Sequence, residues 1–281
     1  MRPLQWAKNG LVFAAPLFAH RLFEGGTLAR SVAAAIVFCA VSSGIYLIND
    51  VRDAAEDRLH PRKRHRPIAA GAVSERHARI VAAALLAGGA AAAVALRPLF
   101  GGVILAYIGL MLLYAHGLKR LVILDVFAIA AGFVLRAAGG AVAIDVPFSP
   151  WLYVCTMLLA LFLGFGKRRH ELTSLLGDAG KHRANLDSYT VPFLDQLIGL
   201  TGAATVVAYA LYTFDAPNAP SNQAMMLTIP FVVYALFRYL YLIHCRGLGG
   251  APEELLVADA PLLAGIAGWG LVTVVILYLG Q

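Results

Sequence analysis

Residues 27–57 read TLARSVAAAIVFCAVSSGIYLINDVRDAAED, an apolar run that passes without a break into an acidic segment. The part at 27–48 is long enough to cross a bilayer as a helix, which takes about 20 residues. Similar apolar runs recur along the 281 residues, of which 60% are hydrophobic and only 14% are charged. The sequence therefore predicts an all-α, polytopic membrane protein, with one transmembrane domain over 1–281.

The apolar runs predict about nine transmembrane helices. Several of the runs are shorter than about 20 residues, so those helices are expected to tilt or to insert only partly. The predicted ranges are 10–24, 27–48, 76–96, 99–115, 121–143, 150–166, 190–213, 223–244 and 257–280.

Lys and Arg are concentrated in three loops between these helices, at 50–76, 116–120 and 167–189. With nine helices, all three loops fall on one side of the membrane, and the opposite loops are nearly free of Lys and Arg. Because basic loops favour the cytoplasm, the N-terminus and these loops are predicted to face the cytoplasm from the inner (plasma) membrane.

The two long charged loops follow the second and the sixth helix. This offset of four helices predicts two topological halves, about 1–116 and 117–244, followed by a last helix at 257–280. The two loops would then face one central cavity that opens to the cytoplasmic side.

The acidic segment places several oxygen ligands on one helix face. If the second helix continues, Asn49, Asp53 and Asp57 recur at four-residue steps, and Asp50 lies between the first two. All four then share a face about 100° wide. Carboxylates this close repel one another unless a cation lies between them, and oxygen ligands favour Mg²⁺ or Ca²⁺ over Zn²⁺. Because Mg²⁺ usually binds a few carboxylates and substrate phosphates, we predict a magnesium site here.

Basic side chains follow at once, at Arg58, Lys63, Arg64 and Arg66, on backbone that two prolines interrupt. Guanidinium forks and ammonium groups are suited to phosphate oxygens, so this half of the segment is predicted to clamp phosphates. Nucleic acid is not an expected partner, because the patch is short and lacks aromatic residues for base stacking.

Simpler interpretations stay open for both halves. The acids could form a solvated helix end that pairs with Arg52 and Arg58, and the basic loop could only set orientation or contact anionic lipid.

Further candidates lie outside this segment. Arg136 falls inside the predicted helix 121–143, where a charge is costly and marks a candidate site, although a buried pair with an acid elsewhere is an alternative. Lys167 and Glu171 are four residues apart and could form a helix ion pair or a second phosphate-binding wall. The substrate-binding candidates are Lys8, Arg58, Lys63, Arg64, Arg66, Lys119, Arg136, Lys167, Arg168, Glu171, Arg183 and Tyr189.

The pattern NDxxDxxxD at 49–57, at a helix end of a nine-helix chain, resembles the UbiA superfamily of intramembrane prenyltransferases. Longer strings resemble its polyprenyl-phosphate (decaprenyl-phosphate) phosphoribosyltransferase branch over nearly the whole chain. These strings are QWxKN at 5–9, NDVRDAAEDRLHP at 49–61, KRxRPIAAG at 63–71, GFVLRA at 132–137 and GKR at 166–168.

The resemblance implies transfer of 5-phosphoribosyl from 5-phosphoribosyl-1-pyrophosphate to a polyprenyl phosphate, with release of pyrophosphate. It implies that Mg²⁺ held by Asn49 and the catalytic carboxylates Asp50, Asp53 and Asp57 neutralises the leaving group. The basic loop would clamp the donor phosphates. The candidates for the acceptor phosphate are Lys8, Lys119, Lys167 and Arg168.

One departure from the wider superfamily favours this branch. Ordinary members carry a second aspartate-rich motif after the sixth helix, where this chain has Lys167, Arg168 and Glu171. The alternatives are a prenyltransferase that uses a prenyl pyrophosphate and an aromatic acceptor, and a non-catalytic lipid-phosphate transporter or scaffold. A homo-oligomer is left open beside a monomer.

Overall fold

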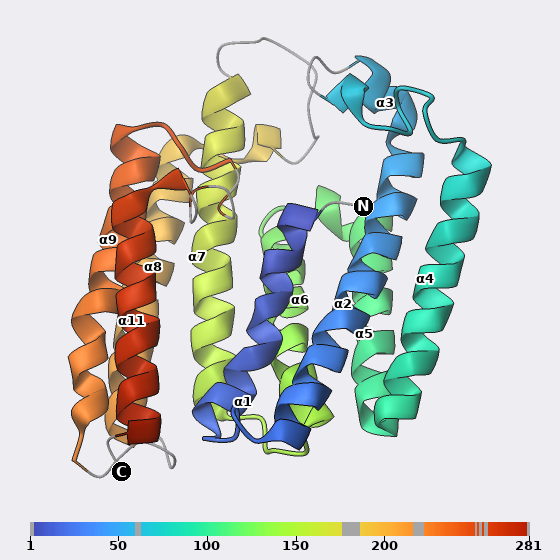
Figure 1. Ribbon diagram of the computed structural model, residues 1–281. Helices are drawn as coiled ribbons and strands as arrows, with labels where there is room; N and C mark the ends of the chain where they lie inside the picture. The colour runs from blue at the N-terminus through green and yellow to red at the C-terminus, as the bar shows by residue number, and fades with distance from the viewer. Residues whose placement is uncertain are drawn as a thin grey trace.

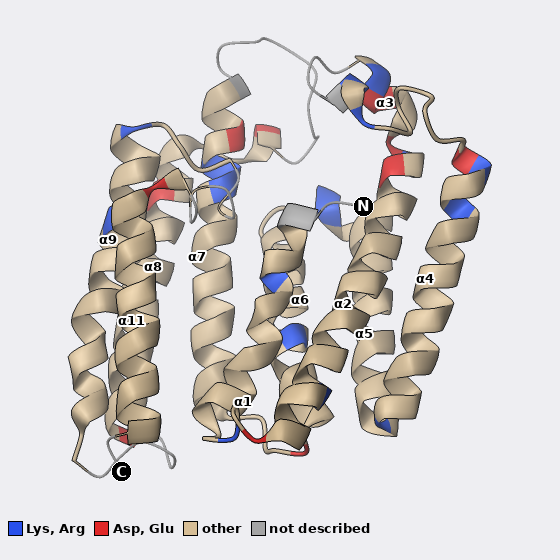
Figure 2. Cartoon of the chain, viewed as in Figure 1, with Lys and Arg blue, Asp and Glu red and all other residues tan. Residues whose placement is uncertain are grey.

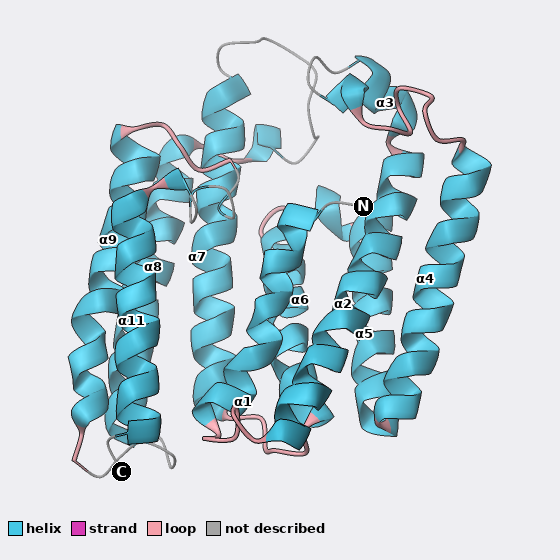
Figure 3. Ribbon diagram, in the orientation of Figure 1, coloured by secondary structure: helices cyan, strands magenta, loops and turns pink. Residues whose placement is uncertain are grey.

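The computed structural model describes residues 3–59, 63–175, 186–215, 222–250 and 258–279, together with residues 252 and 255. Over these residues the secondary structure is helical, without strands (Figure 3). Eight of the described helices are long and apolar enough to cross a membrane. They are α2 (Gly25–Arg52), α4 (Glu75–Leu96), α5 (Pro98–His116), α6 (Leu124–Ala143), α7 (Pro150–Leu175), α8 (Val191–Asp215), α9 (Ile229–Cys245, extended by the turn η5 at Ala224–Thr228) and α11 (Ala260–Leu279). The prediction of an all-α, polytopic membrane protein is confirmed.

The first predicted helix, 10–24, is wrong in both its bounds and its type. The N-terminal segment instead forms a 3-10 helix, η1 (Pro3–Phe13), followed by the short α1 (Ala14–Phe18). The backbone ends α1 with His20 in the left-handed region (φ 58°), and Arg21 N donates to Pro16 O (3.0 Å). This pattern of bonds satisfies the last carbonyls and stops the helix although the sequence remains apolar.

The sixth predicted helix, 150–166, also differs from the structure, where it corresponds to α7. α7 continues to Leu175, beyond the predicted end at 166, so Lys167 and Glu171 lie on a helix and not in a loop. The drop in hydropathy at Lys167 marks where the helix leaves the apolar region, and not where it ends.

The helices pack in chain order around α6 (Figure 1). On one side, α2 contacts α4, α4 contacts α5 and α5 contacts α6, around a core that includes Phe38, Phe100 and Ile104. On the other side, α6 contacts α7, α7 contacts α8 and α9 contacts α11, around a second core that includes Phe162 and Leu194. The division into two topological halves, and the central cavity between them, stay predictions.

The charged side chains gather at one end of the bundle, which carries α3 (Ala54–Leu59), η3 (Leu118–Arg120) and the last turns of α7 (Figure 2). We call it the charged end. The first two basic loops meet there, because Lys119 Nζ lies 3.4 Å from Asp53 Oδ1. The expectation that the basic loops share one face is therefore met for the described residues.

The N-terminal segment lies between α2 and α6, and a glycine permits this approach (Figure 1). A Cβ at Gly140 of α6 would lie 2.1 Å from the carbonyl oxygen of Val12 in η1.

We expect Gly140→Ala to lower the free energy of unfolding by about 1–3 kcal/mol or more, since the backbone of η1 must shift. Gly109→Ala is the matched control, because a Cβ there meets no atom within 4 Å. Thermal unfolding in detergent would compare them, and equal melting temperatures would contradict the expectation.

Candidate active site

The acidic segment stays helical across a kink. α2 ends at Arg52, Asp53 adopts φ −88° and ψ 4°, and α3 begins at Ala54. The helical hydrogen bonds nevertheless continue, because Asp53 N donates to Asn49 O (2.9 Å) and Asp57 N donates to Asp53 O (2.8 Å). Residues 49, 53 and 57 are therefore linked by successive helical turns, as the predicted face requires.

Cations from two other segments contact these carboxylates. The Nη1 atom of Arg66 lies 2.6 Å from Asp57 Oδ2 and 3.4 Å from Asp50 Oδ1, so one nitrogen bridges two aspartates. Lys119 from η3 pairs with Asp53 (3.4 Å). Asp57 is only 3% exposed, and a carboxylate this buried requires a charged partner.

The nearer arginines have other partners. Arg52 Nη1 donates to Ala115 O (2.6 Å), which fixes the end of α2 to α5. Arg58 Nε donates to Ala69 O (3.3 Å), and its Nη2 lies 3.8 Å from Glu75 Oε1. The alternative in which the aspartates pair with these two arginines is therefore wrong.

The described residues place no group of three or more His, Cys, Asp or Glu side chains where it could hold a metal ion as it stands. The donor chemistry suits Mg²⁺ all the same, because the face offers carboxylate and amide oxygens beside a phosphate-binding candidate. The metal ligands Asn49, Asp50, Asp53 and Asp57 stay predictions.

The basic loop folds back over α3. Ile68 is buried against Leu47, Val51, Ala54 and Ala78, and this contact fixes the loop to α2 and α4. The fold-back brings Arg66 to the aspartates, whereas the side chain of the exposed Arg64 hydrogen-bonds, among the described residues, only to His65 (3.4 Å from Nε to Nε2). Lys63 lies in the short η2 (Lys63–His65), but its side chain is outside the description, and so is the whole of Arg183.

Arg168 is the centre of a buried network at the charged end of α7. Its side chain is 2% exposed, and its Nε donates to Asp125 Oδ2 (2.7 Å) while its Nη1 donates to Glu171 Oε2 (2.5 Å). The Tyr189 hydroxyl donates to Asp125 Oδ1 (3.1 Å) and accepts from the Ile123 amide (2.6 Å). Burial raises the pKa of Tyr189 to about 12, so the phenol stays protonated and can donate at neutral pH.

These contacts change the interpretation of three candidates. Arg168, Glu171 and Tyr189 join α6, α7 and the segment before α8, so they are placed to hold these elements together. Glu171 pairs with Arg168, and among the described residues it does not form the ion pair with Lys167 that was one of the two alternatives. Sequence reasoning missed Asp125 as the acid of this network, although an acid in the first turn of an apolar helix was a usable signal.

Lys167 is the cation that this network leaves available. Of three consecutive basic residues, Arg168 pairs with Asp125 and Arg169 pairs with Asp195 (2.5 Å). Lys167 is partly exposed and makes no hydrogen bond or ion pair with any residue that the structure describes.

We expect Lys167→Ala to raise the KM for a phosphorylated substrate about tenfold, the loss of one charge-assisted hydrogen bond. Initial rates at varied substrate concentrations would measure this effect. Lys167→Arg is the control, because it keeps the charge, and a KM that stays at the wild-type value in Lys167→Ala would contradict the role.

The other two candidates lie near the N-terminal segment. Arg136 is 5% exposed, and among the described residues it pairs with no carboxylate, unlike the expected alternative. Lys8 Nζ donates to Gln5 Oε1 (2.5 Å).

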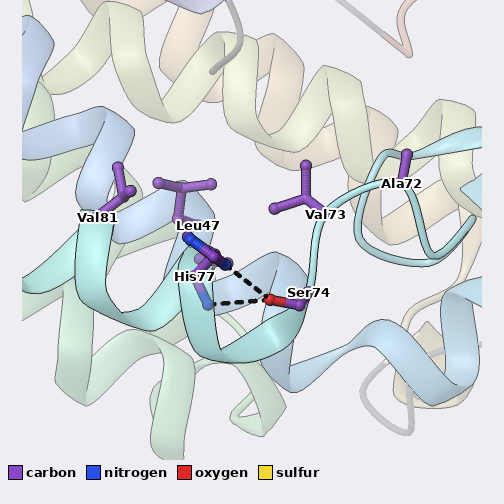
Figure 4. A pocket seen from close by; sticks show the side chains of 7 residues that line it. Leu47, Ala72, Val73, Ser74, His77 and Val81 are labelled. Atoms are coloured by element: carbon purple, nitrogen blue, oxygen red, sulfur yellow. Dashed lines mark hydrogen bonds between the residues drawn. The ribbon is translucent and has the colours of Figure 1, made fainter.

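An open hollow of about 420 Å³ lies between α2, the loop before α4 and the first turns of α4 (Figure 4). The Ser74 Oγ that caps α4 accepts from the His77 amide (3.2 Å) at its edge. None of the predicted metal or phosphate ligands lines it. Its lining residues are Leu47, Ala72, Val73, Ser74, His77, Ala78 and Val81.

The sequence model of the UbiA prenyltransferase family matches residues 10–251. The chain belongs to the UbiA prenyltransferase family. The matched range includes both the segment with the aspartates and the segment with Arg168.

Within the UbiA family, the chain is similar to decaprenyl-phosphate phosphoribosyltransferases of two bacteria. It is 38% identical to that of Mycolicibacterium smegmatis, over 96% of this chain and 88% of the relative. It is 36% identical to that of Corynebacterium glutamicum, over 99% of this chain and 86% of the relative. The fold matches that of a UbiA homolog from Archaeoglobus fulgidus bound to DMAPP and Mg²⁺, with a TM-score of 0.73, 20% identity, and coverage of 97% of this chain and 96% of that one.

Proposed function

We propose that the protein transfers the 5-phosphoribosyl group of 5-phosphoribosyl-1-pyrophosphate to a polyprenyl, decaprenyl-like phosphate, with release of pyrophosphate. The observation that carries the proposal is the similarity, over 96% and 99% of this chain, to two decaprenyl-phosphate phosphoribosyltransferases. The cluster of aspartates, Arg66 and Lys119 at the charged end supports it, because a pyrophosphate leaving group needs cations around it.

The donor binds at the acidic face of α2 and α3. Asn49, Asp50, Asp53 and Asp57 are the residues that would hold Mg²⁺, which supplies charge neutralisation for the leaving pyrophosphate when bound. Arg66 and Lys119 already lie against these aspartates, so they can reach phosphate oxygens bound at the same face. The other cations assigned to the donor phosphates are Arg58, Lys63 and Arg64.

The acceptor is a phosphate monoester that is already ionised near neutral pH, so its attack needs no strong side-chain base. One acceptor oxygen bonds to the anomeric carbon as the bond from that carbon to pyrophosphate breaks. Catalysis then consists of positioning and charge stabilisation. Lys8 and Lys167 are the cations assigned to the acceptor phosphate, and the lipid tail lies between helices.

The charged end faces the cytoplasm from the inner (plasma) membrane in this proposal. The basic loops at 50–76 and 116–120 gather there, and loops with this composition stay on the cytoplasmic side. The water-soluble donor then reaches the aspartates directly through the predicted central cavity, while the acceptor arrives within the bilayer. The homo-oligomer stays a prediction.

The proposal is tested with purified protein in nanodiscs, polyprenyl phosphate, and phosphoribosyl pyrophosphate labelled in the ribose. We expect label to enter the lipid phase with Mg²⁺ and to stay in the aqueous phase after a chelator is added. Transfer from a prenyl pyrophosphate to an aromatic acceptor under the same conditions would overturn the proposal. Binding of polyprenyl phosphate without any release of pyrophosphate would indicate a transporter or scaffold instead.

A further inference from the structure

Arg136 is a buried cation in the interior of α6, and it makes three hydrogen bonds to neutral groups. Its Nε donates to Asn9 Oδ1 (2.8 Å), its Nη2 to the Tyr107 hydroxyl (2.7 Å) and its Nη1 to Gly132 O (2.8 Å). These acceptors belong to η1, α5 and α6. A charge held in a membrane span without a carboxylate is costly, so the arrangement calls for a function.

The 3-10 geometry of η1 explains why Asn9 meets Arg136. With three residues per turn, Trp6, Asn9 and Val12 lie above one another on one stripe. Trp6 Nε1 donates to Ser43 Oγ of α2 (3.2 Å), and Val12 packs where α6 has Gly140. Asn9, which is 1% exposed, also donates from Nδ2 to the Cys39 sulfur of α2 (3.1 Å). Asn9 therefore joins η1 to both of its neighbouring helices.

The neighbouring stripe of η1 carries Gln5 and Lys8. Lys8 Nζ donates to Gln5 Oε1 (2.5 Å), which also accepts from the Tyr46 hydroxyl (3.4 Å). Tyr46 lies one turn of α2 before Asp50, so Lys8 is directed toward the helix end that carries the aspartates. In an α-helix the two stripes would rotate away from this alignment, because three residues then cover about 300°.

We propose that Arg136 is a positioning residue that holds η1 in this register and thereby directs Lys8 at the acceptor phosphate. The planar guanidinium of Arg136 donates to η1, α5 and α6 at once, so it holds Asn9 of η1 against these two helices. The ammonium group of a lysine would not fix this geometry. The assignment of Lys8 to the acceptor rests on the proposed function. The attachment of η1 by Arg136 rests on the contacts alone.

The attachment is tested by tryptophan fluorescence, because Trp6 lies on η1 and the chain has only three tryptophans. In a Trp151→Phe/Trp269→Phe background, we expect Arg136→Met to raise iodide quenching of Trp6 about twofold or more in nanodiscs, as expected for local opening. A Trp6→Phe/Trp151→Phe background reports Trp269 of α11, whose quenching should not change. Arg97→Met is the matched control, since Arg97 binds Val142 O and Asp145 at the opposite end of the bundle.

A second variant removes the same bond from the other side and leaves the charge in place. Asn9→Ala should raise Trp6 quenching as Arg136→Met does. The test of whether Arg136 holds η1 then does not depend on the correct folding of one variant alone. Trp6 quenching that stays at the control value in both variants overturns the proposal.

The functional part is tested by a double-mutant cycle on acceptor kinetics. We expect Lys8→Ala and Arg136→Met each to raise the acceptor KM about tenfold, the loss of one charge-assisted hydrogen bond. Their kcat values should remain within about threefold of wild type, because the lost interaction is uniform binding. The double variant should equal Lys8→Ala within about twofold, since Arg136 acts through Lys8.

The outcomes separate the positioning role of Arg136 from the acceptor-binding role of Lys8. A double variant whose KM rises about a hundredfold, as independent effects predict, overturns the positioning role. If Lys8→Ala alone leaves the acceptor KM unchanged, the acceptor role of Lys8 in the proposed function fails. The fluorescence result still decides whether Arg136 holds η1, even if no phosphoribosyl transfer is found.

Discussion

Asp57→Asn is expected to lower phosphoribosyl transfer by at least about 10²–10³-fold, the loss seen when one group that stabilises transition-state charge is removed. Asn has nearly the same shape as Asp, so the helix and the membrane insertion should remain. The side chain is buried and paired with Arg66 at 2.6 Å, and in the proposed function it belongs to the face that would hold Mg²⁺ and the donor. Asp53→Ala and Asp57→Ala are expected to abolish turnover in the same way, with insertion intact.

Glu56→Gln is the matched control, because Glu56 is the neighbouring carboxylate but is exposed on another face of α3. It should keep near-normal turnover. The measurement is initial-rate transfer of labelled phosphoribosyl at saturating Mg²⁺, with equal amounts of protein recovered from the membrane. A double variant of Asp53 and Asp57 that remains active and dependent on Mg²⁺ would be incompatible with the assignment.

Arg168→Met is expected to lower the free energy of unfolding by about 3–5 kcal/mol, because it removes the cationic partner of the buried Asp125 carboxylate. Asp125 is 0% exposed and accepts from both Arg168 and Tyr189. The loss should also separate α6, α7 and the segment before α8, so activity should fall together with stability. Thermal unfolding in detergent, followed by loss of soluble protein, measures the effect.

Two comparisons make the Arg168 prediction specific. Arg79→Met removes an exposed i,i+4 pair with Glu75, which contributes only about 0–1 kcal/mol. The double variant Asp125→Asn/Arg168→Met also removes the buried negative charge of Asp125, which the single variant leaves uncompensated. It should therefore regain part of the stability. A single Arg168→Met variant as stable as Arg79→Met would show that the buried pair contributes little.

Local sequence determined the class of the protein and the composition of its main site. Apolar runs of helical length predict spans because the bilayer acts on each segment separately. For eight of the nine predicted helices, the observed helix ends within three residues of the predicted end or continues beyond it. The spacing of Asn49, Asp53 and Asp57 follows from the helical repeat alone, so it survives the kink at residue 53. Loop charges likewise predicted the shared charged end.

Tertiary structure decided which charges are available to a ligand. The sequence places Lys167 and Arg168 side by side, but only packing shows that Arg168 is enclosed with Asp125, 43 residues away, while Lys167 pairs with none of the described residues. Arg136 meets Asn9 across 127 residues, and η1 takes a 3-10 form that the apolar pattern of 10–24 does not reveal. The physical reason is that burial of a charge and choice of its partner depend on which helices lie side by side, whereas span and periodicity depend on neighbours along the chain.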